Sequence, residues 1–86
     1  MTAGSVEPEP VVRLDLRGTP CPLNFIRTKL ALEQVALGEL LQVDLDRGEP
    51  QQLVTQGLES SGQAVTSIPH PEQQGAVRLL IRRHAG

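Results

Sequence analysis

Hydrophobic and charged residues alternate between Val12 and Arg17, so that every second side chain is apolar. This period of two predicts a strand with one buried face, and Gly18 ends it with a turn. The same alternation recurs over 41–46 and predicts a second strand. Two more strands are expected at 64–68 and 77–82, joined as a hairpin by the polar loop 69–75.

Between the first two strands the apolar residues change to a helical spacing. This spacing predicts a helix over 22–37, which Gly38 stops. One apolar stripe of this helix consists of Phe25, Leu32, Val35 and Ala36, and a second consists of Leu23, Ile26, Leu30 and Leu37. One stripe can cover a sheet, and we expect the second to pack against the next helix. The alternative for the second stripe is an exposed patch near Cys21 that docks another protein.

A shorter helix is expected over 51–60, opened by Glu49 and Pro50 and ended at 61–62. The order is then strand, helix, strand, helix, strand, strand. Strands joined through a helix tend to run parallel, by right-handed crossovers. The sequence therefore predicts the α/β class: an α+β two-layer sandwich in which a four-stranded mixed sheet carries two helices on one face.

The 86 residues are enough for one small domain, which we place at 11–83. Residues 1–10, rich in proline and glutamate, are expected to form a disordered tail, and 84–86 a C-terminal tail. No stretch is apolar enough to span a membrane and no secretion signal is present, which predicts a soluble, cytoplasmic protein. The net charge of −2 and the scattered basic residues argue against direct nucleic-acid binding.

Cys21 is the only cysteine and lies between the first strand and the first helix. Proline disfavours helical dihedral angles in the preceding residue, so Pro20 and Pro22 hold Thr19 and Cys21 extended. Pro22 then becomes the first helical residue and Cys21 the N-cap. Unpaired N–H groups and the helix dipole stabilise a thiolate at this position. A buried, inert thiol is the alternative, and the polar, proline-flanked context argues against it.

A single cysteine excludes an internal disulfide and the multi-cysteine zinc patterns, and it indicates a reducing compartment. Asp44 and Asp46 share one face of a strand and could be mistaken for a metal-binding or acid/base pair. No third ligand accompanies them, so we expect a solvated strand edge. His70, in the hairpin loop, and His84, in the C-terminal tail, are expected at the surface.

The segment Leu14-Asp15, followed by Gly18 and then by Cys21-Pro22, resembles the signature of the TusA/SirA-like sulfur carrier proteins. The resemblance covers about 11–83 and implies a small two-layer fold with a four-stranded mixed sheet and two helices. It also implies that Cys21 accepts sulfane sulfur as a persulfide from a cysteine desulfurase or rhodanese-like donor. The expected function is therefore a stoichiometric, sulfurtransferase-type relay without a bound cofactor, in which an acceptor protein takes the sulfur for tRNA thiolation or related trafficking.

The family pattern is Cys-Pro-x-Pro, whereas this chain has Asn24 at the fourth position. Asn24 retains an N–H and adds a polar side chain, which predicts a less rigid helix start and a hydrogen bond to the sulfur or to a partner. We expect Gly18, Pro22, Asn24 and Asp15 to support the sulfur site, Asp15 by holding the turn before Gly18. The expected docking surface consists of Leu23, Ile26 and Arg27.

Two other functions stay open. A regulatory or protein-binding module would keep the fold and use the surface around Cys21 for contacts only, and Asn24 favours it. RNA binding rests only on a fold-level analogy with some translation-factor domains, and the acidic balance weighs against it. Arg17, Arg27 and Lys29 could guide an acidic partner, although each is more commonly a solvated charge.

Overall fold

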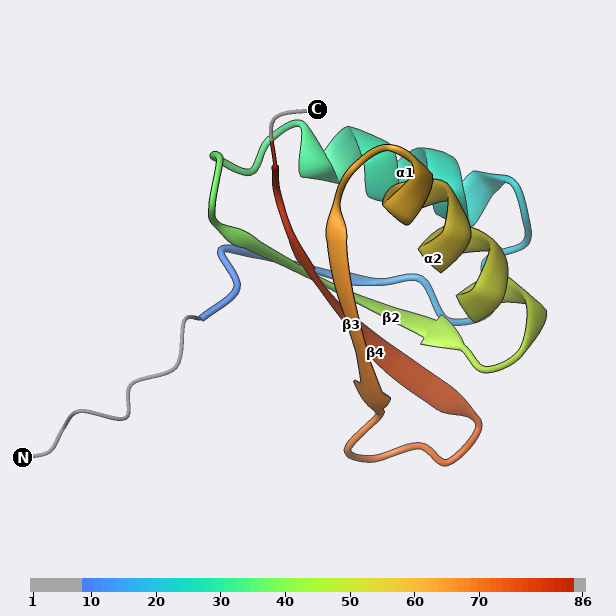
Figure 1. The fold of residues 1–86 in the computed structure, drawn as a ribbon. Helices are drawn as coiled ribbons and strands as arrows, with labels where there is room; N and C mark the ends of the chain where they lie inside the picture. The colour runs from blue at the N-terminus through green and yellow to red at the C-terminus, as the bar shows by residue number, and fades with distance from the viewer. Residues whose placement is uncertain (1–8, 85–86) are drawn as a thin grey trace, which may run out of the picture.

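The computed structural model describes residues 9–84. Residues 1–8 of the expected N-terminal tail and residues 85–86 of the expected C-terminal tail lie outside the described residues. Along the chain the elements are β1 (Val12–Asp15), α1 (Leu23–Leu32), β2 (Leu40–Asp46), α2 (Glu49–Ser60), β3 (Ala64–Pro69) and β4 (Ala76–Arg82) (Figure 1). This is the element order that the alternation of apolar and polar residues predicts.

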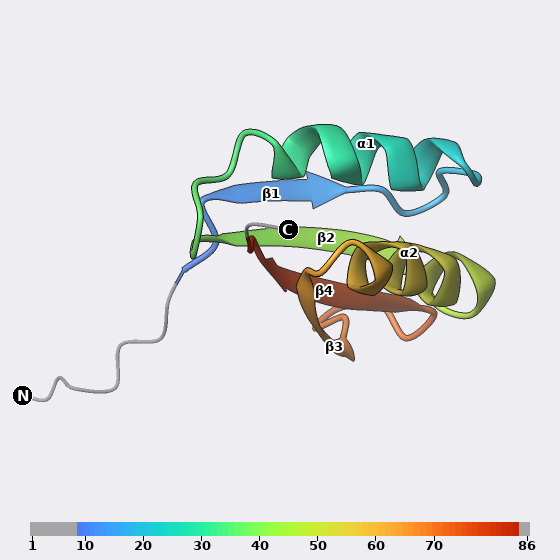
Figure 2. The same cartoon turned by 45° about the horizontal axis from the view of Figure 1, so that its top comes forward.

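The four strands form one mixed sheet in the order β1-β2-β4-β3. β1 runs parallel to β2, whereas β4 is antiparallel to both β2 and β3. Both helices cover the same face of the sheet, with α1 above β1 and β2 and α2 on the side of β3 and β4 (Figure 2). The predicted two-layer sandwich, with two helices on one face of a four-stranded mixed sheet, is therefore confirmed.

The core lies between the sheet and the helices, and it is almost entirely aliphatic. Alternate residues of the two central strands face it and are essentially fully buried: Leu41, Val43, Leu45, Leu79 and Ile81. α2 contributes Val54 and Leu58, while Phe25 of α1 packs against this cluster and is partly buried. The period of two in the strands thus directs one face of the sheet inward.

α1 ends at Leu32 rather than at residue 37, so the predicted helix is too long. After Leu32 the chain tightens: Gln34 and Val35 donate their N–H groups to the carbonyls three residues before them. The guanidinium of Arg83 then donates to the Val35 carbonyl at 2.7 Å, supplying a partner that a helix end otherwise lacks. Val35 still reaches the core, which explains why its spacing resembles that of the helix.

The second apolar stripe of the predicted helix is exposed, so the expectation that it packs against α2 is wrong. Leu23, Ile26, Leu30 and Leu37 keep 46%, 47%, 57% and 62% of their surface accessible. The two helices meet instead at Phe25 and Gly57, where a Cβ on Gly57 would lie 2.5 Å from the ring atom Cε1. Because this close approach uses a different flank of α1, the stripe is left facing solvent.

Asp44 and His70 are buried, in contrast to the expected solvated positions. Asp44 lies on β2, a central strand, and His70 in the hairpin loop contacts it: His70 Nε2 is 3.2 Å from Asp44 Oδ2. Arg78 of β4 donates from Nε to Asp44 Oδ1 at 2.9 Å. This hydrogen bond raises the pKa of Arg78. His84 is exposed, as expected.

The tautomer of His70 follows from its two contacts. Its Nδ1 accepts the N–H of Glu72 at 3.0 Å, so the ring proton lies on Nε2 and points to Asp44. Within residues 9–84, no three His, Cys, Asp or Glu side chains form a cluster that could hold a metal ion. The described helices are also too short or too polar to cross a membrane.

Candidate functional site

Cys21 lies in the turn that joins β1 to α1 and is exposed. This turn lies at the end of the sheet where β1 stops and where both helices begin (Figure 1). The N-cap of α1 is Pro22 rather than Cys21, so the predicted cap is off by one residue. The reason is that the N–H of Asn24 donates to the carbonyl of Pro20 at 3.1 Å, which closes a turn around Cys21 ahead of the helix.

An apolar hollow lies beside the thiol. It has a volume of about 210 Å³ and is lined by Cys21, Pro22, Phe25, Leu53 and Gly57. Gly57 contributes no side chain, and Leu53 is half-exposed at the rim. The hollow therefore lies between the first turns of α1 and the middle of α2. An apolar side chain of another molecule can bind in it, next to the sulfur.

The electropositive seat expected from free N–H groups is smaller than predicted. The N–H of Asn24 donates to the Pro20 carbonyl, and the N–H of Phe25 donates to Asn24 Oδ1 at 2.6 Å. Among the described hydrogen bonds of this turn, the N–H groups of Cys21 and Leu23 have no acceptor. These two donors remain available near the sulfur, whereas proline at position 22 has no N–H to offer.

Asn24 is fully buried, so the prediction that its side chain contacts a partner is wrong. Its Oδ1 is occupied by the N–H of Phe25, and within the described residues no hydrogen bond joins Asn24 to Cys21. Its Nδ2 has no hydrogen-bond partner in the part of the chain that the structure describes. Asn24 thus acts on the turn from inside, through the backbone of α1, whereas sequence reasoning expected its side chain to contact the sulfur or a partner.

The turn before Cys21 is held by two carboxylates. Asp15 accepts the Arg17 N–H at 3.2 Å and the Arg17 guanidinium at 2.8 and 2.7 Å. These hydrogen bonds lower the pKa of Asp15 to about 2. Arg17 also donates to Gln73 Oε1 at 2.8 Å, which links the turn to the hairpin loop.

Asp46 is the second carboxylate, and sequence reasoning assigned it to solvent instead. Its Oδ2 accepts the N–H of Gly18 at 2.7 Å. Gly18 has a positive φ of 78°, a region that glycine adopts without steric cost. The sequence shows an acidic residue at the end of β2 but does not show that β1 and β2 are neighbours, so this contact could be found only from the strand order.

The three expected docking residues are accessible. Leu23 and Ile26 lie in the exposed stripe of α1, and Arg27 is exposed beside them. They follow Cys21 within six residues and belong to the N-terminal half of α1. We call Leu23, Ile26 and Arg27 the α1 docking surface below.

Comparison with known proteins gives consistent results. The family model described as sulfurtransferase TusA matches residues 8–83. A protein of Archaeoglobus fulgidus, whose curated name describes it provisionally as a sulfur carrier protein, is 42% identical over 55 residues, or 64% of this chain. The match spans 62% of the length of that relative.

A solved structure shows the same fold. The crystal structure of a SirA-like protein from Desulfitobacterium hafniense superposes with a TM-score of 0.69 at 22% sequence identity, over 81% of this chain and 93% of that chain. The match to the family model includes the β1–α1 turn with Cys21 and every described strand and helix. On this evidence the chain belongs to the TusA sulfurtransferase family.

Proposed function

We propose that this protein is a sulfur carrier that binds sulfane sulfur as a persulfide on Cys21 and relays it to an acceptor protein. The observation that carries the proposal is the exposed position of the single thiol, at a helix start beside an apolar hollow, in a chain of the TusA family. Persulfide exchange needs a sulfur that another protein can reach, and Cys21 meets that requirement.

The relay consists of two exchange steps. The Cys21 thiolate attacks the outer sulfur of a donor cysteine persulfide; the donor S–S bond breaks, and the donor leaves as a thiolate. An acceptor thiolate then attacks the outer sulfur of the Cys21 persulfide, and Cys21 is released as a thiolate. Sulfur and charge balance in each step, and no bound cofactor takes part. The chain acts stoichiometrically, as a carrier.

The partners in this proposal are a sulfur donor, such as a cysteine desulfurase or a rhodanese-like protein, and an acceptor protein. The α1 docking surface is their binding site, because Leu23 and Ile26 are large apolar side chains that remain about half exposed. Arg27 adds a positive charge for an acidic partner. The proposed location is the cytoplasm, where thiols stay reduced, and the proposed destination is tRNA thiolation or related sulfur trafficking.

Four residues support the position of the sulfur. Gly18 and Asp15 hold the preceding turn, and Pro22 caps the helix. Asn24 holds the first turn of α1 from the core side, through its contact with the N–H of Phe25. In this arrangement Cys21 is the only reacting residue, and the others fix its position.

The experiment that tests the proposal is intact mass spectrometry of the reduced protein after incubation with a cysteine desulfurase and cysteine. We expect the wild type to gain one sulfur atom, which reductant removes, and Cys21→Ser to gain none. Parallel samples use thiosulfate with a rhodanese. A variant without Cys21 that still loads, or a wild type that loads with neither donor nor with polysulfide, would contradict the proposal.

A matched pair of variants tests the docking surface. Ile26→Glu places a charge next to the site, and Leu37→Glu places the same charge at an equally apolar, exposed position beyond the end of α1. We expect Ile26→Glu to slow loading by the donor protein about tenfold and Leu37→Glu to leave it unchanged, since the loss of a central apolar contact is typically more than 1 kcal/mol. Equal effects would remove this surface from the proposal.

A protein-binding or regulatory module is the second candidate. It is favoured by Asn24, which replaces the second proline of the family's Cys-Pro-x-Pro pattern. The Asn24 side chain accepts the N–H of Phe25, which could otherwise donate to the sulfur. In that case the protein would bind partners through the α1 docking surface while Cys21 gains no sulfur from any donor. The mass measurement above separates the two functions.

A further inference from the structure

β3 is an edge strand whose outer side is open. Within the described residues 9–84, it pairs with β4 on one side only. Its residues, Ala64–Pro69, include no charged side chain, and all but Val65 are exposed. The opposite edge, β1, is only four residues long and carries Arg13 and Asp15. Proteins usually protect sheet edges with short strands and charges, so β1 is a protected edge and β3 is an edge open to pairing.

The register identifies the backbone groups that point outward from β3. The N–H of His70 donates to the Ala76 carbonyl at 3.2 Å, and hydrogen-bonded pairs alternate along an antiparallel ladder. Counting backward from this pair, the backbone N–H and C=O groups of Ile68, and of every second residue before it, point toward β4. The backbone groups that point away from β4 are the N–H and C=O of Val65 and Ser67 and the C=O of Pro69.

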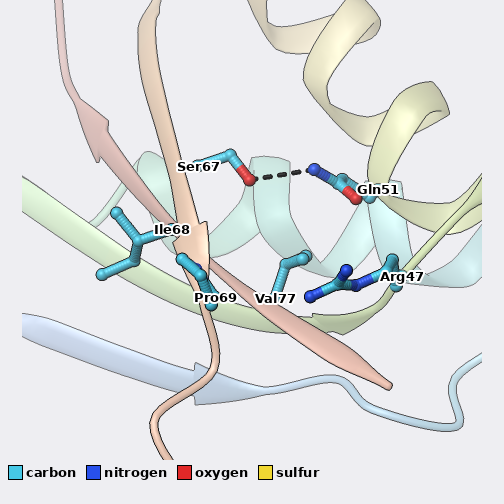
Figure 3. A pocket seen from close by; sticks show the side chains of 6 residues that line it. All are labelled: Arg47, Gln51, Ser67, Ile68, Pro69 and Val77. Atoms are coloured by element: carbon cyan, nitrogen blue, oxygen red, sulfur yellow. Dashed lines mark hydrogen bonds between the residues drawn. The ribbon is translucent and has the colours of Figure 1, made fainter. Parts of the chain in front are cut away.

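Two hollows lie along this edge, between β3 and α2. The first has a volume of about 230 Å³ and is lined by Arg47, Gln51, Ser67, Ile68, Pro69 and Val77 (Figure 3). The second has a volume of about 240 Å³ and is lined by Gln51, Gln52, Thr55, Gln56 and Ser67. Gln51 Nε2 donates to Ser67 Oγ at 2.9 Å where the two meet. We call the pair of hollows the α2–β3 trough.

The chemistry of the trough is polar, with one positive end. The side chains of α2 that line it are amides and a hydroxyl. The Oγ1 of Thr55 is buried and has no hydrogen-bond partner among residues 9–84. At the end next to Pro69, the exposed Arg47 has neither an ion pair nor a side-chain hydrogen bond to any residue of the described range 9–84. A polar chain with an acidic group at that end would satisfy these groups.

We propose that the free edge of β3 binds an extended segment of a partner protein as an added antiparallel strand. The segment carries an acidic side chain near its N-terminal end, facing Arg47, and polar side chains at alternate positions toward the trough. Its other face is apolar, because Ile68 and Thr66 of β3 are exposed on the open face of the sheet. Backbone hydrogen bonds to Val65 and Ser67 provide affinity, and the alternate side chains provide specificity.

The partner is a different protein rather than a second copy of this chain. β3 contains no acidic residue, so two copies paired edge to edge through β3 would leave Arg47 without an opposite charge from the added strand. A pair of six-residue strands also offers much less contact than the roughly 1,600 Å² typical of a stable interface. The trough, which is wide enough for side chains and lies outside the β3–β4 pairing, fits a single peptide strand.

The trough is separate from the sulfur site. Leu53 and Gly57 line the hollow next to Cys21, whereas Gln52 and Gln56, one residue before each, line the trough. The two sites thus lie on different faces of α2, because neighbouring residues of a helix point about 100° apart. A partner strand on β3 leaves Cys21 open, and its binding can be measured without any sulfur transfer.

The test selects peptides from a displayed library of random eight-residue segments, with the full reduced chain as target. A selected peptide is synthesised, and its dissociation constant is measured by fluorescence anisotropy. Amide hydrogen exchange is followed in the same complex. We expect peptides with alternating apolar and polar residues and an acidic residue near the N-terminus. We also expect the N–H groups of Val65 and Ser67 to exchange rapidly in the free protein and slowly in the complex.

Two pairs of variants localise the binding. Ser67→Pro removes an outward N–H, whereas Ser67→Ala loses the contact to Gln51 but keeps that N–H, so only the proline should weaken binding, about fivefold. Arg47→Glu should weaken it about threefold, and a peptide with lysine in place of the acid should restore it. If Ser67→Pro does not fold, the exchange of the two amides in the wild type decides alone.

The proposal is overturned if no peptide is selected, if selected peptides leave both amides in rapid exchange, or if alkylation of Cys21 abolishes binding. It is also overturned if these amides become protected in the free protein as its concentration rises, because the edge then pairs with a second copy.

Discussion

Asp46 Oδ2 accepts the N–H of Gly18 at 2.7 Å, so the C-terminal end of β2 holds the turn that leads to Cys21. β1 and β2 are parallel neighbours, so their C-terminal ends lie at the same end of the sheet. The turn therefore has an anchor in the adjacent strand in addition to the local contact between Asp15 and Arg17. The position of the sulfur depends on both.

Replacement of Asp46 by alanine should loosen this turn. The variant loses a charge-assisted hydrogen bond to a backbone N–H, and we expect it to lower the free energy of unfolding by about 1 to 2 kcal/mol. Chemical denaturation measures this effect. The rate of sulfur loading should fall even under conditions in which the variant is fully folded, because Cys21 lies only three residues after Gly18.

Asp46→Asn is the control, since the amide keeps an oxygen that can accept the same N–H. It should recover most of the stability and most of the loading rate. Loading rates that are equal in the alanine variant and the wild type would show that the position of the turn does not matter for the sulfur.

The buried contact among Asp44, His70 and Arg78 should contribute strongly to stability. Asp44→Ala leaves the guanidinium of Arg78 without its partner, and we expect a loss of about 3 kcal/mol, since removing one member of a buried pair typically costs 3 to 5. His70→Ala should cost only about 1 kcal/mol, as it removes one neutral donor. Both values come from urea denaturation.

Asp15→Ala is the matched control for Asp44→Ala. Asp15 lies directly opposite Asp44 in the β1–β2 register but is exposed, and among residues 9–84 it is paired only with Arg17. Its replacement should cost clearly less stability than Asp44→Ala, because solvent screens an exposed ion pair. If the two alanine variants lose equal stability, burial of Asp44 does not determine its role.

The strands and their order along the chain were predictable because their signal is local. Val12 and Leu14, like Leu41 and Val43, alternate with polar residues, and the pleat of a strand sends alternate side chains to opposite faces. The end of α1 was not predictable: Val35 keeps a helical spacing after the helix has stopped, and Arg83, far along the chain, completes the helix end.

The contacts around the site were only partly predictable, because they join distant segments. Cys21 and its exposure follow from the flanking prolines and the helix start. The partners of Asp44 are 26 and 34 residues away, so a residue that alternates like a surface position turned out to be buried. Asn24 was misplaced for a related reason. The prediction put its side chain near the sulfur, whereas Asn24 and Thr28, one turn apart, are both buried toward the sheet.

The pair of Asp15 and Arg17 should give the protein a specific dependence on acid. The pKa of Asp15 is lowered from 3.8 to about 2 by its hydrogen bonds to Arg17. A lowered pKa means that the pair stabilises the fold above the unfolded value of 3.8 and that this contribution disappears as the pH falls toward 2. The difference in Tm between the wild type and Asp15→Asn should therefore be constant near neutral pH and vanish below about pH 2.

The carboxyl carbon of Asp15, followed by NMR through the same titration, reports this pKa directly. Arg17→Gln should raise the midpoint from about 2 toward 3.8, because it removes the guanidinium that lowers it. An unchanged midpoint in this variant would mean that another group holds the carboxylate in its charged form.

Gly57→Ala should be destabilising although alanine favours helices. The added Cβ would lie 2.5 Å from Cε1 and 2.9 Å from Cζ of the Phe25 ring, which is too close for carbon atoms that are not bonded to each other. Alanine gains about 1 kcal/mol of helix propensity over glycine, while overpacking of this kind costs about 1 to 3 kcal/mol, so the sign depends on how far the ring can move. Phe25 lies against the core, which limits that movement, and we expect a net loss of about 1 kcal/mol in the free energy of unfolding.

The double variant Phe25→Leu with Gly57→Ala tests whether the ring causes the loss. Leucine removes the ring atoms that the new Cβ would meet, so Gly57→Ala should be neutral or stabilising in that background, and the two changes should not be additive. Because Phe25 and Gly57 also line the hollow next to Cys21, the single variant should slow sulfur loading by a donor protein, yet leave reaction of the thiol with a small alkylating agent unchanged. Equal slowing of both reactions would instead mean that the change disturbs Cys21 itself, and the hollow would then have no separate part in seating a partner.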